Sequence, residues 1–153
     1  MGLFNLFKRK EIIRVSESEK MNDFKNIAMI AIDFAKIEIE NTGSFLPFGA
    51  VMTKNNELQM IVYTDPSKTE VDHRVNATII QNIIMKRYNE PNLILSFMAW
   101  DGVLHSESGD IDCINIKIDD KIDNIHKTLT YGYTKNNGVF NLADKENPII
   151  KQN

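Results

Sequence analysis

The first third of the chain carries apolar residues at helical spacing. Residues three and four positions apart share one face of a helix, so such a stripe predicts an amphipathic helix. Ser16 and Glu19 form a capping box before the stripe, and Gly43 after it accepts the positive φ at which helices end. We therefore expect a helix over about 17–41. The residues of the stripe are Phe24, Ile27, Ala28, Ala31, Phe34 and Ala35.

Two short apolar runs, 48–54 and 58–64, follow this helix. Pro47 favours extended backbone at Leu46, directly before the first run. Asn55 and Asn56 separate the runs, and asparagine tolerates the positive φ of tight hairpin turns. The pattern predicts a β-hairpin directly after the helix.

A second helix is predicted over about 67–89. Pro66 suits the first position of a helix, Ser67 and Glu70 form a possible second capping box, and Pro91 ends the pattern. Its broad apolar face is built from Val71, Val75, Ile79, Ile80, Ile83, Ile84 and Tyr88.

The rest of the chain alternates between strand patterns and turns. The run 93–100 is apolar at successive positions, which is typical of a central buried strand, whereas 110–118 alternates. Residues 127–134 and 139–143 predict a final hairpin. The fold class is therefore α+β, in the order α-β-β-α-β-β-β-β. We expect one antiparallel sheet with both helices packed on it, as a single domain over 16–153 preceded by an arm over 1–15.

The arm begins apolar and then becomes basic. This order is the reverse of a secretory signal, and no apolar run in the chain approaches membrane-spanning length. These two features, together with the single cysteine, Cys113, favour a cytoplasmic location. The arm is interpreted as a frayed or locally docked terminus; the alternatives are a partner groove or a membrane surface contacted through Leu3, Phe4 and Phe7.

Negative charge is concentrated in one span. The chain carries a net charge of −3, although residues 1–14 hold four basic side chains and one acidic one. An acidic body argues against nucleic acid as a partner and favours a basic protein; the alternative is ordinary solubility. The acidic residues of 101–123, which we predict as the partner-binding set, are Asp101, Glu107, Asp110, Asp112, Asp119, Asp120 and Asp123.

Three stretches together carry a family resemblance. They are Gly43-Ser44-Phe45-Leu46-Pro47-Phe48-Gly49-Ala50-Val51, Asp110-Ile111-Asp112-Cys113-Ile114-Asn115-Ile116 and Tyr131-Gly132-Tyr133. Over roughly 18–150 the chain resembles a family of small bacterial α+β proteins of unknown function with an aromatic-x-Pro-Phe-Gly/Ala hairpin after the first helix. The resemblance implies a fold, possible immunity-type roles and no catalytic residues.

Few residues suggest chemistry. Cys113 is a candidate nucleophile with His105 or His126 as base, but a thiol among isoleucines on a strand usually serves packing. His105, Asp101, Asp110 and Asp112 flank one loop and could form a metal site; the alternative is a solvated surface. No nucleotide-binding or hydrolase motif is present, so we predict no cofactor.

These observations favour a non-catalytic binding protein. One form of it is a bacterial immunity-type protein that neutralises a basic toxin through an acidic face. The alternative is a small enzyme or a small-ligand or metal binder that uses the His105/Asp110/Asp112 loop. A third possibility is a structural assembly subunit that pairs through an exposed sheet edge.

Overall fold

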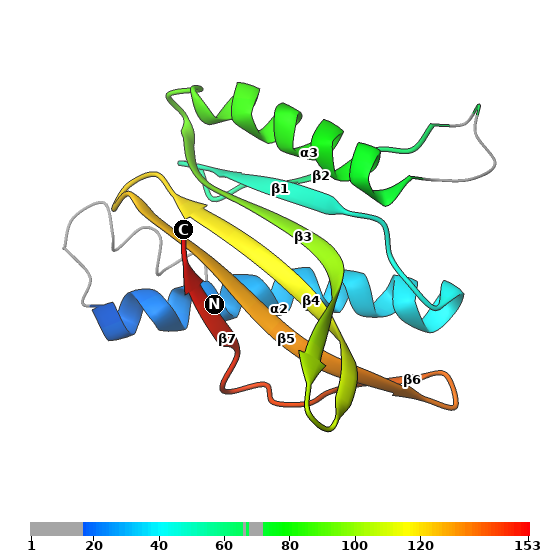
Figure 1. The fold of residues 1–153 in the computed structure, drawn as a ribbon. Helices are drawn as coiled ribbons and strands as arrows, with labels where there is room; N and C mark the ends of the chain where they lie inside the picture. Colours follow the sequence, from blue (N-terminus) through cyan, green and yellow to red (C-terminus); the bar gives the residue numbers. More distant parts are fainter. Residues whose placement is uncertain (1–16, 66, 68–71) are drawn as a thin grey trace.

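The computed structural model describes residues 17–65, 67 and 72–153, and it confirms the predicted α+β class and element order. Helix α2 lies on one face of a sheet and α3 on the other (Figure 1). The predicted arm over 1–15 and the capping residue Ser16 lie outside the described residues. The elements are α2 Glu17–Thr42, β1 Phe48–Thr53, β2 Leu58–Ile61, α3 His73–Tyr88, β3 Leu93–Ser106, β4 Gly109–Asp120, β5 Ile125–Asn136, β6 Val139–Leu142 and β7 Ile149–Gln152.

The seven strands form one open antiparallel sheet in the order β2-β1-β3-β4-β5-β6. The last strand, β7, was not predicted from the sequence; it pairs with the first half of β5, whereas β6 pairs with the end of β5. Asn56 and Asn137 have positive φ in the turns that join β1 to β2 and β5 to β6. The asparagine turn signals were therefore correct.

The main core lies between α2 and the sheet. Phe24, Ile27, Ala31 and Ala35 of the predicted stripe are buried against β-strand side chains. The aromatic segment after α2 is core as well, because Phe45 and Phe48 are each only 2% exposed. Phe34 belongs to the predicted apolar stripe, but its expected burial was wrong: it is 36% exposed, although its ring lies 4.6 Å from that of Phe48.

A second, smaller core joins α3 to the opposite face. Ile80 and Ile84 pack on Val51 of β1 and Met98 of β3. The close approach requires Gly49, since a Cβ there would lie 2.6 Å from Ile84 Cδ1 and 2.9 Å from the Phe97 carbonyl oxygen. The helix therefore rests almost directly on the β1 backbone.

Helix α3 begins later than predicted. Asp72 is its N-cap: the carboxylate accepts hydrogen bonds from the backbone N–H groups of Arg74 and Val75. The predicted capping residue Glu70 lies outside the described residues, and Ser67 instead donates to Asp65. An aspartate at the N-cap satisfies the free N–H groups of the first turn, which explains the start at His73.

One helix cannot cover the α3 face of this sheet. Strands lie about 4.8 Å apart, so six strands span roughly 24 Å, whereas a helix with its side chains is about 10 Å wide. Helix α3 packs on β1 and β3 and leaves the β4, β5 and β7 part of this face without a covering element among the described residues (Figure 1). We call this uncovered part of β4, β5 and β7 the open face. The candidate site lies between it and α3.

Candidate functional site

The structure does not gather the predicted acidic set on one surface. Asp101, Glu107, Asp110 and Asp112 lie toward the tip of the β3–β4 hairpin, and the other three lie at the opposite end of β4. At about 3.3 Å per residue, the two ends of the 12-residue β4 are roughly 36 Å apart. The set therefore forms two groups at opposite ends of the sheet.

The second acidic group is engaged within the protein. Asp120 is 1% exposed and forms an ion pair with the buried Lys20 of α2, which also pairs with Asp123. Asp120 Oδ1 in addition accepts hydrogen bonds from the backbone N–H groups of Ile122 and Asp123. These two carboxylates hold the β4–β5 turn to α2, and Asp120 offers almost no surface to a partner.

The hairpin tip holds the loop that was considered as a metal or ligand site. His105 Nδ1 lies 2.8 Å from Asp110 Oδ1, and both side chains are largely exposed. Asp101 accepts a hydrogen bond of 3.4 Å from the Tyr133 hydroxyl, while burial first and the nearby Asp112 second raise the pKa of its carboxyl above the usual range. Within the described ranges, no three His, Cys, Asp or Glu side chains form a group that could hold a metal ion.

Cys113 is a packing residue in this geometry. Its thiol is 2% exposed, and burial first and Asp101 second raise its pKa, which opposes formation of the reactive thiolate. Cys113 pairs with Gly102 on β3 and Gly132 on β5, so His126 lies six residues further along β5, roughly 20 Å away. The candidate base His126 is therefore out of reach of the sulfur.

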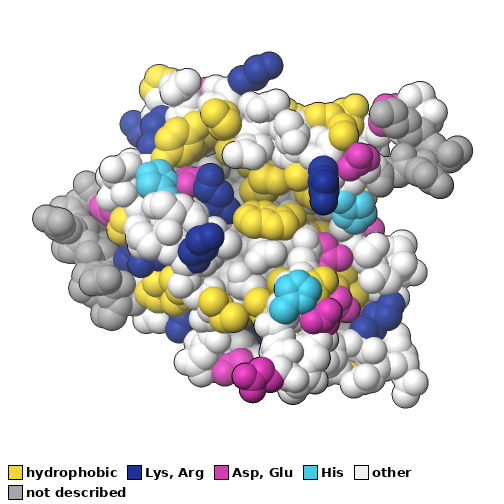
Figure 2. Space-filling view, viewed as in Figure 1, with side chains coloured by type: hydrophobic (Ala, Val, Ile, Leu, Met, Phe, Trp, Pro, Cys, Tyr) yellow, Lys and Arg dark blue, Asp and Glu magenta, His cyan; other side chains and the backbone are white. Residues whose placement is uncertain are grey.

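A groove runs between α3 and the open face. Its volume is about 590 Å³, and β3 forms its floor. Figure 2 shows hydrophobic side chains along the middle of this side of the molecule, with lysine or arginine side chains beside them. We call this hollow the α3 groove; its lining residues are Ala77, Gln81, Ile84, Met85, Ser96, Phe97, Met98, Trp100, Lys117 and Asp119.

A second hollow continues the α3 groove toward the β4–β5 turn. It shares Ile84, Met85, Ser96, Lys117 and Asp119 with the first. The additional residues at this end are Tyr88, Asn89, His126 and Asn153. The two hollows therefore form one depression that is apolar at one end and more polar at the other.

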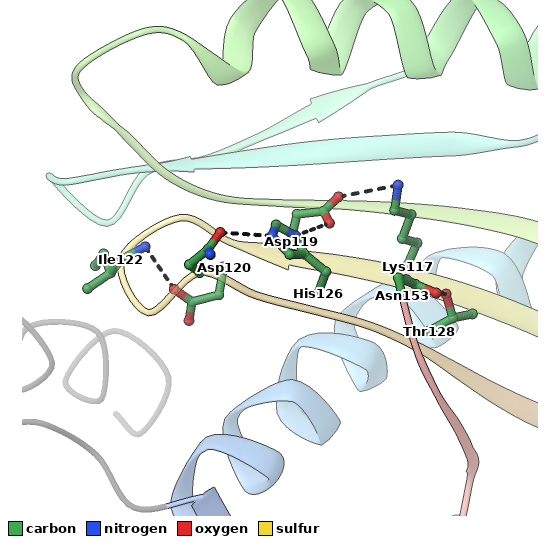
Figure 3. A network of polar contacts seen from close by, with 8 residues as sticks. Lys117, Asp119, Asp120, Ile122, His126, Thr128 and Asn153 are labelled. Carbon is green, nitrogen blue, oxygen red and sulfur yellow. Dashed lines mark hydrogen bonds and ion pairs between the residues drawn. The ribbon is translucent and has the colours of Figure 1, made fainter.

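The polar end is organised around Asp119. His126 Nδ1 lies 2.7 Å from Asp119 Oδ1, and His126 Nε2 lies 3.0 Å from Asn124 Oδ1 (Figure 3). Lys117 Nζ lies 3.9 Å from Asp119 Oδ2, which is an ion pair but too long for a hydrogen bond. Burial first, and then the charges of Asp119 and Asp120, raise the pKa of Tyr88 at the same end.

Ser96 lies on the groove floor as a buried, unpaired hydroxyl. It is 0% exposed, and its Oγ has no hydrogen-bond partner among the described residues. Ser96 pairs with Asp119, which pairs with His126, so Ser96 and His126 are two strands apart, or about 10 Å. This spacing separates the three residues too widely for a Ser-His-Asp catalytic triad, in which the imidazole contacts the hydroxyl.

Only one feature of this groove, the polar face of β4, could be predicted from the sequence. Cys113, Asn115, Lys117 and Asp119 occupy alternate positions of β4, opposite to Ile114, Ile116 and Ile118, so a polar face of this strand was predictable. The pairing of strands and the position of α3 depend on long-range contacts, which the alternation does not encode.

Three further observations extend beyond the groove. No helix in the described part of the chain is long and apolar enough to cross a membrane. The three stretches that carry the family resemblance lie in the α2–β1 connection and β1, in β4 and in β5, and their resemblance stays a prediction. Comparison with protein-family models, with curated proteins and with solved structures gave no match to this chain.

Proposed function

We propose that this chain is a non-catalytic binding protein that holds its ligand in the α3 groove. The observation that carries this proposal is the unpaired, fully buried Ser96 hydroxyl on the floor of an apolar depression beside Trp100. A buried polar group without a partner costs free energy, and a bound ligand can supply that partner. Ligand sites are commonly apolar clefts of this size with a few placed polar groups.

Binding fits the groove better than catalysis does. The imidazole of His126 is held on both of its nitrogens, by Asp119 and Asn124, so neither nitrogen points to the Ser96 hydroxyl. Cys113 does not line either hollow. The free buried thiol also suits a reducing compartment, and we include a cytoplasmic location in the proposal.

Nile red, an uncharged apolar dye, tests this proposal. We expect a saturable rise of its emission with the wild-type protein, since the dye would enter the apolar part of the groove. Met85→Arg places a charge at the groove rim, where Met85 is 61% exposed, and should weaken binding several-fold with little effect on folding.

The matched control is Ile37→Arg, because Ile37 is 59% exposed on α2, on the other side of the sheet. This variant should bind Nile red as the wild type does. Emission that does not saturate, or equal binding by all three proteins, would show that the groove is not a ligand site.

As a second candidate, we propose capture of a basic protein by the tip of the β3–β4 hairpin. Four of the seven predicted acidic residues lie there, and Asp112 is close enough to raise the pKa of Asp101. In this second candidate, an immunity-type protein would bind its basic toxin through the hairpin tip alone, and not through the whole acidic set. Its support is charge complementarity, which steers association and weakens as salt rises.

A pull-down from native lysate tests this second candidate. The wild type should retain a basic protein at low salt, and the triple variant Glu107→Gln, Asp110→Asn, Asp112→Asn should not. A control variant, Asp33→Asn with Glu38→Gln, removes two exposed charges from α2 and should behave as the wild type. If wild type and triple variant retain the same proteins at low and high salt, or if neither retains any, the hairpin tip is only a solvated surface.

A further inference from the structure

We propose that the α3 groove selects a small amphipathic anion, namely a carboxylate on a compact or unbranched apolar body. This inference rests on the proposed function and assigns the ligand class of the same groove. The apolar body would lie on Met98, Trp100 and Ile84, and the carboxylate would accept hydrogen bonds from Lys117 and Ser96.

Two polar groups at the groove can donate hydrogen bonds to a ligand. Lys117 Nζ carries three donor hydrogens, and its only ion-pair partner among the described residues is Asp119, at 3.9 Å. Ser96 Oγ can donate one more hydrogen and has no hydrogen-bond partner within the described part of the chain. Lys117 pairs with Met98, two residues along β3 from Ser96, so the two donors lie in adjacent rows of the same sheet face.

The carboxylate that lines the groove is already engaged at one of its two oxygens. Asp119 is the carboxylate that lines the groove, and the His126 ring nitrogen 2.7 Å away engages its Oδ1. Asp119 repels an anion that approaches it directly, and Ser96 is its cross-strand neighbour. The bound carboxylate must therefore reach Ser96 from the side of Lys117, whose ammonium offsets this repulsion. A cationic ligand would have to displace His126 from Asp119 or meet the Lys117 ammonium.

Positive charge extends across the open face. Lys117 pairs with Thr128, and Thr128 pairs with Lys151 of β7, so the two lysines occupy one cross-strand row. Although the chain as a whole has a net charge of −3, this row carries two cations, and Met98 of β3 is the cross-strand neighbour of Lys117. Charge complementarity therefore favours an anion at the open face.

The size of the groove favours a small molecule as the occupant. Its volume of about 590 Å³ lies within the range of small-molecule sites. Ser96 is 0% exposed at the floor, so the group that reaches it must be narrow. A carboxylate at the end of an alkyl or aryl body meets both conditions.

Trp100 provides the readout, since it is the only tryptophan of the chain and it lines the groove. The test titrates the full chain with octanoate, octanol and octylammonium, each below the concentration at which it aggregates, and follows Trp100 fluorescence and the heat of binding. We expect octanoate to bind at least about tenfold more tightly than octylammonium, since the Lys117 ammonium donates a charge-assisted hydrogen bond to a carboxylate and repels another ammonium.

Two variants separate the role of Lys117 from general charge. Lys117→Met should weaken octanoate about tenfold and leave octanol unchanged, because the methionine keeps the apolar stem and loses the donors. The matched control is Lys127→Met, since Lys127 pairs with the buried Ile118 on β4 and so belongs to the opposite face of the sheet. Ser96→Ala should also weaken octanoate and should fold, because its hydroxyl has no partner to lose.

Every other result of the titrations would overturn the proposed function, the anion assignment or both. If none of the three compounds binds, the proposed function fails together with the inference. If all three bind with similar affinity, the groove is a ligand site but the anion assignment is wrong. Heat of binding without a change at Trp100, or equal losses in Lys117→Met and Lys127→Met, would place the octanoate elsewhere and overturn the inference.

Discussion

Replacing Lys20 with alanine is expected to lower the free energy of unfolding by about 3–5 kcal/mol, which is the cost of breaking a buried ion pair from one side. Lys20 is 3% exposed and pairs with Asp120, which is 1% exposed. Its loss removes the buried ammonium that pairs with Asp120 and Asp123, and it releases the β4–β5 turn from α2. Urea denaturation measures the change as a lower midpoint with an unchanged slope.

Two comparisons isolate the ion pair. Lys36→Ala on the same helix removes an exposed lysine and should change stability by less than about 0.5 kcal/mol. Lys20→Met combined with Asp120→Asn removes both charges, so it should cost less than the sum of the two single variants. A Lys20→Ala midpoint equal to that of Lys36→Ala would mean that the pair does not hold the turn.

Phe48→Ala should cost about 3–5 kcal/mol, because it deletes a fully buried aromatic ring. Phe48 is 2% exposed and joins three other rings, with centroids 4.6 Å away at Phe34, 5.8 Å at Phe45 and 6.4 Å at Phe97. The expected result is a large fall of the denaturation midpoint with no loss of cooperativity.

Phe34→Ala is the matched control, since it deletes the same ring at a position that is 36% exposed. Its cost should be clearly smaller, because much of the ring already contacts water and the ring pair itself contributes about 0.5–1.5 kcal/mol. Equal costs for the two variants would contradict the placement of Phe34 at the edge of the core.

The Phe34 error shows what helical spacing can and cannot predict. The spacing identified α2 and most of its buried residues correctly. It did not define the width of the buried stripe, which centres on Ala28, Ala31 and Ala35 and reaches Ile32 and Ile39 on one side. Phe34 falls at the opposite rim, where the width of the contact with the sheet decides burial.

The acidic span shows a second limit. Along a strand, successive side chains point to opposite faces and the chain advances about 3.3 Å per residue. Charges that are close in sequence between Asp110 and Asp120 are therefore spread along β4 and over two faces. The partner of Asp120 is Lys20, which is 100 residues away in the sequence, and no local pattern indicates that pairing.

The order of the elements along the chain and the turns were predictable because they depend on local chemistry. Asparagines adopted positive φ where the hairpins needed it, and alternation separated the buried isoleucines of β4 from its polar side chains. The α3 groove depends instead on how one helix covers part of a wide sheet. Such a depression becomes visible only when the strands and the helix are placed together.

The most direct test of ligand binding in the α3 groove is a two-dimensional ¹⁵N–¹H spectrum of the protein titrated with octanoate. We predict shifts for the amides of 96–100, 117–119 and 81–85, which surround the groove, and for the indole N–H of Trp100. The amides of the hairpin tip, 105–110, should not move. Shifts confined to the hairpin tip or to α2, with the groove amides unchanged at saturation, would contradict the account.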